Sequence, residues 1–413
     1  MRDHGARTAV LTLLLLAFPA AGRSEEEPAA ADPLDALIEQ NTHRLEWRDD
    51  GPSGPGWERI VSEGRAAEFF LIGESHGNRE TPRLTVALAK ALRPAGYSAL
   101  GVEVGPITAR RLVELCRSGE GVEAFRAFLE EFAFSFPYFW WREEAEMLCR
   151  ILDEGYEVWG LDQEFIGSAR FLLGDLRALV EDPDHRAQVD AWLAEADAAR
   201  AAAEEGGKMD GLFIQTVDPE ALRAFADRLP AEAERAREIA RELAATAVVY
   251  QHYGAQRYFE NNRDRVRLIK RYFRQALAGS AAGDGAKAII KMGSVHSGRG
   301  RSPMMQLDIG NTASELAALR GGDSFHLVFF TRRSVAADGS ESDWAEEAPA
   351  LAMLDAHRPE GAWALFDLRP LRSHFASSKR REQNPDLADY VFRYDALLLA
   401  DRFHAAETLV PLP

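Results

Sequence analysis

The sequence has few cysteines, fewer basic than acidic residues and only one long apolar run. Its 413 residues include two cysteines, and 49 Lys and Arg stand against 66 Asp and Glu, which gives a formal net charge of −17. So few cysteines exclude a disulfide-rich fold. The excess of acid argues against unaided binding to nucleic acid or anionic lipid, because both need a basic surface that displaces counterions. We therefore expect a globular protein whose partner is small or cationic, with a small-molecule substrate and no nucleic-acid partner.

Several sequence signatures of bound cofactors are also missing. The chain contains no G-x-G-x-x-G, no Walker loop, no H-E-x-x-H and no cluster of Cys and His with metal-ligand spacing. No cofactor is therefore required by the sequence.

The one long apolar run lies at the N-terminus. Arg2 and Arg7 precede the apolar residues 9–18, and small residues follow at 20–22, which is the pattern of a secretory signal. The run has about half the length that crosses a bilayer. We predict a signal peptide over residues 1–22 and an exported protein, periplasmic or secreted, with no stable membrane insertion after cleavage.

Export would place the two cysteines in an oxidising compartment. Cys116 and Cys149 could pair there, but both fall in stretches with a helical pattern, and the sequence does not give their separation in space. A disulfide and two buried free thiols are both compatible with the sequence.

Short apolar runs alternate with longer helical patterns, which is typical of βαβ units. After the first run, Thr81 is a suitable N-cap, Pro82 suits the first helical turn, and Gly96 ends the helical pattern. Consecutive apolar residues predict strands that are covered on both faces. The predicted fold is α/β, with a mostly parallel sheet flanked by helices. The seven runs are 69–72, 99–102, 158–161, 288–292, 325–330, 363–366 and 396–399.

A long central segment lacks such runs. Residues from about 165 to 262 are rich in Ala, Glu and Arg with helical periodicity, so we predict an inserted helical lid subdomain. A polar, acidic stretch over 335–348 is expected to be an exposed loop. The predicted organisation is a signal peptide, a leader with a first helix over 23–67, and one α/β domain over 68–413 that carries the insertion.

Polar side chains follow four of the predicted strands. Glu74 and His76 follow the first, Glu103 the second, Asp162 the third and His296 the fourth. The carboxyl ends of parallel strands share one edge, where ligands bind. These residues should therefore meet, and such a set could serve as general acid and base or hold a divalent metal. The candidate metal ligands are Glu74, His76, Glu103 and His296.

Each of these residues also has a structural interpretation. A single histidine after a strand is often only a hydrogen-bonded structural residue, and the carboxylates could cap helices or form ion pairs. Two further candidates could contact the substrate. Trp141 belongs to an aromatic run that could form a pocket wall or simply fill the core, and Arg299 could bind an anionic group or lie in a solvated loop.

The segment Gly73–Gly77 also fits G-x-S-x-G, the nucleophile elbow of α/β-hydrolases. An elbow serine leads directly into a helix, whereas the helical pattern here begins only at Thr81. Such enzymes also have several strands before the elbow. A nucleophilic Ser75 is therefore the weaker alternative.

Taken together, these motifs resemble those of the erythromycin esterase-like proteins, which share a wider superfamily with the ChaN-like haem-binding proteins and the TraB/Tiki proteases. The resemblance implies that His76 is the general base that activates water. It also implies that Glu74 and Glu103 orient either His76 or the water, and that His296 lies across the cleft. A further implication is that the helical insertion covers the cleft. The motifs are Gly-Glu-Ser-His-Gly at 73–77, Gly-Val-Glu at 101–103, Trp-Gly-Leu-Asp-Gln at 159–163, Met-Gly-Ser-Val-His at 292–296 and Tyr-Asp-Ala-Leu at 394–397.

Two departures separate the chain from the esterases. The loop between Glu74 and His76 is one residue shorter than usual, and the Trp-Ala-His-Asn run typical of the second histidine motif is missing. Met-Gly-x-x-His is closer to the ChaN and Tiki branches, which leaves haem binding or metal-dependent proteolysis as an alternative. The predicted function is an exported hydrolase that cleaves an ester, lactone or amide by attack of water, without a covalent enzyme intermediate.

Overall fold

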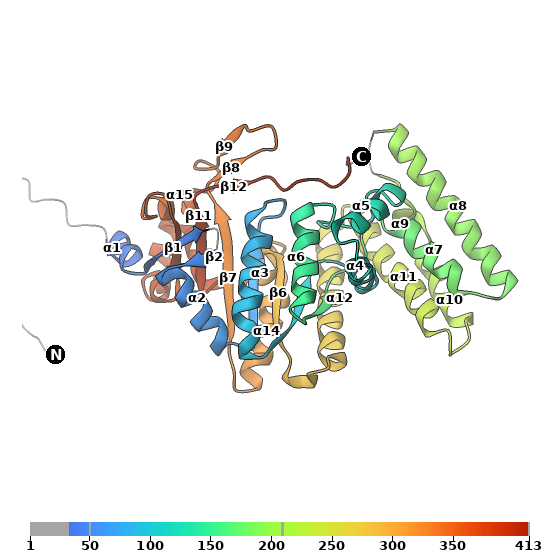
Figure 1. Cartoon of the computed structure of the whole chain (residues 1–413), viewed down its shortest axis with the longest axis horizontal. Helices are drawn as coiled ribbons and strands as arrows, with labels where there is room; N and C mark the ends of the chain where they lie inside the picture. The colour runs from blue at the N-terminus through green and yellow to red at the C-terminus, as the bar shows by residue number, and fades with distance from the viewer. Residues whose placement is uncertain (1–32, 49–50, 208–209, 412–413) are drawn as a thin grey trace, which may run out of the picture.

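The computed structural model describes residues 33–48, 51–207 and 210–411 (Figure 1). The predicted signal peptide lies outside these residues. No helix in the described part of the chain combines the length and the apolar character that a membrane crossing requires.

A nine-stranded sheet forms the centre of the molecule, with the strand order β2-β1-β10-β11-β7-β3-β6-β4-β5. The six strands from β11 to β5 are parallel, and β10, β1 and β2 are antiparallel additions at one side. The predicted α/β fold with a mostly parallel sheet is confirmed. The strands are β1 (Thr42–Arg48), β2 (Gly51–Ser53), β3 (Phe69–Glu74), β4 (Tyr97–Val102), β5 (Glu157–Gly160), β6 (Lys287–Gly293), β7 (Ser324–Thr331), β10 (Trp363–Asp367) and β11 (Ala396–Ala400).

All seven apolar runs are strands of this sheet. Every residue of β3 is buried, and its side chains alternate between two cores: Phe70 and Ile72 pack on one face, and Phe69 and Leu71 on the other. β1 and β2 were not predicted, because β1 buries only Leu45 and so has no apolar run. The segment expected to hold a leader and one helix also contains these two strands.

Helices cover both faces of the sheet (Figure 1). The first crossover helix begins at Glu80, because the side chain of Asn78 accepts a hydrogen bond from the backbone N–H of Thr81 at 2.8 Å. Asn78, and not the predicted Thr81, therefore supplies the capping side chain. The predicted end of the helical segment at Gly96 (φ +90°) is confirmed. The flanking helices are α1 (Pro33–Gln40), α2 (Pro55–Ala66), α3 (Glu80–Leu92), α4 (Pro106–Arg117), α5 (Val122–Glu131), α6 (Arg142–Asp153), α13 (Ser294–Ser297), α14 (Ile309–Leu319), α15 (Pro349–Asp355), α16 (Ser378–Gln383) and α17 (Pro385–Arg393).

The predicted helical insert is present. In Figure 1, α8 and α10 extend beyond the β5 side of the sheet, while α12 packs back toward it. The insert therefore does not lie as a lid along the whole sheet. Residues at the α11–α12 junction, such as Tyr253 and Asn262, line a cavity that Glu103 also lines. The helices of the insert are α7 (Ala169–Leu179), α8 (Pro183–Glu205), α9 (Phe213–Thr216), α10 (Pro219–Arg228), α11 (Glu234–Gly254) and α12 (Tyr258–Gly279).

A disulfide and the C-terminal segment join parts of the chain that are distant in sequence. Cys116 and Cys149 form a disulfide that joins α4 to α6, with a Cα–Cα distance of 5.1 Å. The C-terminal segment crosses above the carboxyl edge, where the parallel strands end (Figure 1), and the backbone N–H of Ala406 donates to the carbonyl of Gly77 at 2.9 Å. The predicted loop after β7 contains a hairpin of β8 (Arg333–Val335) and β9 (Glu341–Asp343), which β12 (Phe403–His404) joins as a third strand.

Candidate functional site

His76 follows β3 at the carboxyl edge and lies between two carboxylates. Its Nδ1 is 3.1 Å from Glu74 Oε1, and its Nε2 is 3.7 Å from Glu103 Oε2. The ring stacks on Tyr138 with a centroid distance of 4.1 Å. The His76 side chain is 27% exposed, whereas both carboxylates are buried. His76 is therefore the member of this group that a ligand can reach.

Glu74 is held in its ionised form by a buried cation. Lys291, on β6, donates to Glu74 Oε1 at 2.6 Å and to Glu144 Oε1, on α6, at 2.8 Å. Burial alone would raise the pKa of Glu74, but Lys291 and His76 hold it below its ordinary value. An ionised Glu74 accepts the Nδ1–H of His76, which leaves the lone pair of neutral His76 on Nε2.

The same surroundings favour the protonated form of His76. Burial alone would lower the pKa of His76, but the charges of Glu74 and Glu103 raise it above its ordinary value. His76 can thus take up a proton readily, and it is a free base only above this raised pKa.

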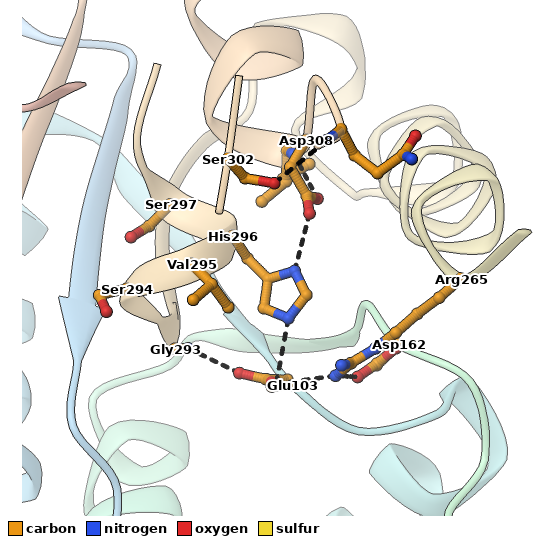
Figure 2. A network of polar contacts seen from close by, with 12 residues as sticks. Glu103, Asp162, Arg265, Gly293, Ser294, Val295, His296, Ser297, Ser302 and Asp308 are labelled. Carbon is orange, nitrogen blue, oxygen red and sulfur yellow. Dashed lines mark hydrogen bonds and ion pairs between the residues drawn. The ribbon is translucent and has the colours of Figure 1, made fainter. Parts of the chain in front are cut away.

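Glu103 follows β4 and is the centre of a second set of contacts (Figure 2). Its Oε2 accepts from the backbone N–H of Gly293 at 2.6 Å, and its Oε1 accepts from Arg265 at 2.8 Å and from the Tyr138 hydroxyl at 3.1 Å. Burial would raise the pKa of Glu103, but His296, His76 and Arg265 hold it well below its ordinary value. Glu103 is therefore a fixed negative charge beside His76.

His296, on α13, lies between Asp308 and Glu103 and is buried (Figure 2). Its Nδ1 is 2.8 Å from Asp308 Oδ2 and its Nε2 is 3.5 Å from Glu103 Oε1. Burial and Arg265 lower the pKa of His296, but Glu103 and Asp308 outweigh them and raise it to about 9. The structure thus brings the two histidines to one carboxylate, yet it places His296 as a buried cation and not as a residue facing an open cleft.

Each ring of the stacked His76–Tyr138 pair lines a different cavity. One has a volume of about 440 Å³, and His76 lies in its wall together with Phe330, Trp344 and Leu351. The other has a volume of about 340 Å³, and Tyr138 lies in its wall. The stacked pair therefore stands at the boundary between the two cavities.

The remaining predicted ligand-binding residues fall in different places. Asp162 lines the smaller cavity and accepts from Arg265 Nε at 3.0 Å. Trp141 packs closely on the loop that holds His76. The contact is so close that a Cβ added at Gly77 would lie 3.0 Å from the Trp141 ring. Arg299 is far from this group: it forms an ion pair with Asp395, at the start of β11, with a nearest distance of 2.8 Å. That position is at the amino edge of the sheet.

Ser75 is exposed, and its hydroxyl has no hydrogen bond to a histidine in the described part of the chain. The next helix begins only at Glu80. The geometry of a nucleophile elbow, with a serine bonded to its base at the start of a helix, is therefore not present at Ser75.

The carboxylates proposed as metal ligands already have cationic partners. Lys291 forms an ion pair with Glu74, and Arg265 forms ion pairs with Glu103 and Asp162. Within residues 33–48, 51–207 and 210–411, no group of three or more His, Cys, Asp or Glu side chains is arranged to hold a metal ion. The described geometry therefore does not favour a metal among Glu74, His76, Glu103 and His296.

Several residues that shape the site were not predicted from the sequence. Lys291 carried a signal, because it is the one charged residue inside an otherwise apolar strand run. Arg265 carried no such signal. The α12 sequence contains many charged residues, and nothing in it distinguishes Arg265 from the exposed ones. Tyr138 could not be separated from its aromatic neighbours by spacing alone.

Comparison with solved structures identifies the same fold in three proteins. A Bacillus cereus protein shares 11% identity, with a TM-score of 0.56 and coverage of 92% of this chain and 100% of the other. A mutant of the erythromycin esterase EreC in its open conformation shares 14% identity, with a TM-score of 0.56 and coverage of 90% and 100%. A succinoglycan biosynthesis protein shares 14%, with a TM-score of 0.55 and coverage of 91% and 98%. The resemblance inferred from the motifs is confirmed at the level of the fold.

No model of a known protein family matches the sequence. No curated protein matches it either.

Proposed function

We propose that this chain is a hydrolase that cleaves an ester, lactone or amide bond with water activated by His76. The observation that carries the proposal is the setting of His76: its Nδ1 faces a carboxylate that Lys291 keeps ionised, and its side chain opens to a cavity. A histidine oriented in this way by a carboxylate is the usual general base of hydrolytic sites. The fold shared with an erythromycin esterase supports the same reaction class.

In the proposed reaction, a water molecule is oriented by Nε2 of neutral His76 and by Glu103, whose Oε2 lies 3.7 Å from that nitrogen. The water oxygen attacks the carbonyl carbon while its proton passes to Nε2. The bond from the carbonyl carbon to the leaving oxygen or nitrogen then breaks, and the proton on Nε2 passes to the leaving atom. The products are an acid and an alcohol or amine, and no bond to the enzyme forms.

The charges around His76 predict the pH dependence of this reaction. The base must be neutral, and Glu74 and Glu103 raise its pKa above the ordinary value of 6.5. The value of kcat/KM should therefore rise with pH, with an apparent pKa above 6.5 in the free enzyme.

The test is a panel of esters, lactones and amides, assayed with and without a chelator and added divalent metals. We expect at least one substrate class to be hydrolysed, with no product burst and with no loss on chelation. A burst of product, or stoichiometric labelling of Ser75 by an organophosphate, would replace this mechanism with that of a serine hydrolase. Loss of activity on chelation, restored by a metal, would replace it with a metal-dependent one.

Export is a second part of the proposal. The predicted signal peptide and the Cys116–Cys149 disulfide both support it, because disulfides persist mainly in oxidising compartments. Mass spectrometry of protein recovered from the producing cells should show a mature chain that lacks residues 1–22, outside the cytoplasm. A full-length chain that remains in the cytoplasm with both thiols free would contradict it.

A further inference from the structure

The smaller cavity, which Tyr138 lines, contains amide and aromatic side chains. We infer that it binds a polyhydroxylated, sugar-like group, so that the bond cleaved at His76 is an ester between an acyl group and a carbohydrate alcohol. This inference rests on the proposed function for its reaction, but its binding site can be tested without any turnover.

The first observation is the set of polar side chains around this cavity of about 340 Å³. Gln163 is only 9% exposed, and its Oε1 has no hydrogen-bond partner. Asn262, which is partly exposed, also lines the cavity. Amides present a donor and an acceptor side by side, which matches neighbouring hydroxyl groups. The Gln163 side chain is hydrogen-bonded to Tyr250, but its buried Oε1 has no partner, which favours a ligand that donates a hydrogen bond to it.

The second observation is a row of exposed aromatic rings at the α11–α12 junction. Tyr253, Tyr258 and Phe259 are 54%, 53% and 58% exposed. Tyr253 lines the cavity, and its ring centroid lies 5.7 Å from that of Tyr258. Large exposed apolar side chains beside a cavity mark a ligand surface, and the negative face of an aromatic ring attracts the C–H groups of a sugar ring.

The third observation is the apolar part of the larger cavity. Phe330, Val335, Leu351 and Phe403 line it together with polar residues such as Thr331, and these apolar side chains suit an acyl chain. An ester with its acyl group there and its sugar beside Tyr138 would have its carbonyl at the boundary, near His76. Hydrolysis would break the bond from the acyl carbon to the sugar oxygen, and the sugar hydroxyl would leave with the proton from His76.

The binding test uses two probes with the same octyl chain, each below its critical micelle concentration. Octyl β-glucoside carries a sugar, and tetraethylene glycol monooctyl ether carries ether oxygens and one hydroxyl. By calorimetry on the whole mature chain, we expect the glucoside to bind at least about tenfold more tightly, since sites built for hydroxyl groups discriminate against ligands that lack them. Equal affinity for both probes would overturn the inference.

Variants locate the site. Tyr253→Ala and Asn262→Ala should each weaken glucoside binding at least about fivefold. Phe392→Ala is the matched control, because Phe392 is a 43% exposed aromatic in a different cavity, at the amino edge. Unaltered glucoside affinity in both cavity variants, with each shown to be folded by circular dichroism, would place the sugar elsewhere and overturn the inference.

The hydrolysis test compares 6-O-octanoyl glucose with hexyl octanoate, which share an acyl group. We expect kcat/KM for the glucose ester to be at least about tenfold higher than for hexyl octanoate. In Asn262→Ala the ratio of the two kcat/KM values should be smaller. If the glucoside preference in binding holds and neither ester is cleaved, the sugar site stands and the proposed ester hydrolysis fails. If both esters are cleaved equally and the two probes bind equally, the hydrolase stands and the sugar site fails.

Discussion

Two buried polar networks occupy opposite edges of the same parallel sheet, and each contains a histidine. At the amino edge, His326 lies on β7, where its Nδ1 is 2.7 Å from the carbonyl of Ser297 and its Nε2 is 2.8 Å from the hydroxyl of Ser324. Burial and Arg299 lower the pKa of His326 to about 3. At the carboxyl edge, two carboxylates raise the pKa of His76 instead.

Burial lowers the pKa of both histidines, and the charges beside each ring decide whether that lowering is reversed. His326 is buried, and burial together with the nearby Arg299 keeps it neutral, as a structural hydrogen-bonding group. His76 is partly exposed, its partners are anionic, and it faces a cavity. A proton can therefore be exchanged with a ligand at His76, whereas His326 serves the fold. The following predictions test this division.

The largest contrast should come from replacing each histidine by alanine. His76→Ala removes the proposed base, and kcat/KM should fall about 10²- to 10⁴-fold, which is about 2.7 to 5.5 kcal/mol of transition-state stabilisation. His326→Ala should lower the free energy of unfolding and leave the kcat/KM of the folded fraction within about threefold. Steady-state kinetics and urea unfolding of both variants measure this. Comparable losses of kcat/KM in the two folded variants would remove the distinction between the edges.

The arginine of each network provides the next contrast. Arg265→Leu leaves the buried carboxylates of Glu103 and Asp162 without their cation. Arg299→Leu removes only one of the two cations beside Asp395, because Arg372 still donates to Asp395 at 2.9 Å. Arg265→Leu should therefore lower the free energy of unfolding by about 3 to 5 kcal/mol, and Arg299→Leu by less. At low denaturant, where both are folded, only Arg265→Leu should lower kcat/KM. A larger loss of stability in Arg299→Leu would contradict the assignment.

The pH dependence of stability should differ in sign between the two edges. The pKa of His296 is raised from 6.5 to about 9, so its stabilisation is complete below pH 6.5 and is lost as the pH rises through 9. The pKa of His326 is lowered from 6.5 to about 3, so its stabilisation is complete above pH 6.5 and is lost as the pH falls toward 3. Each group contributes a slope of at most about 1.4 kcal/mol per pH unit.

Urea unfolding across this pH range measures both slopes. His296→Asn should flatten the decline on the alkaline side, and His326→Asn should flatten the decline on the acidic side. If His296→Asn leaves the alkaline decline unaltered, His296 is not the buried cation that the structure indicates.

The smallest expected effect is that of Ser75→Ala. Because the Ser75 hydroxyl has no hydrogen bond to a histidine in the described residues, its removal should lower kcat/KM less than about tenfold, or 1.4 kcal/mol. The variant is measured beside His76→Ala with the same substrate. Near-complete loss in the folded Ser75→Ala protein would restore the serine as the nucleophile.

Much of the parallel core could be predicted from local sequence, whereas its antiparallel side could not. Strands such as β3 and β6 are buried on both faces, so their burial requires unbroken apolar runs that the sequence displays. β1 pairs with β10 at the side of the sheet and buries only Leu45. Its sequence therefore contains no apolar run that would predict a strand. The helical insert was predictable from its periodicity, but its position beyond β5 was not.

The sequence by itself determined which residues reach the carboxyl edge, because the ends of parallel strands meet there wherever the helices lie. It placed Glu74, His76, Glu103 and His296 at strand ends before any contact was known. Only the tertiary structure decided their charges. Lys291 meets Glu74 across 217 residues and Arg265 meets Glu103 across 162, and neither pairing has a local signature. The pKa of a side chain depends on its burial and on its distance from other charges. The different protonation states of the histidines are therefore set only in the folded chain.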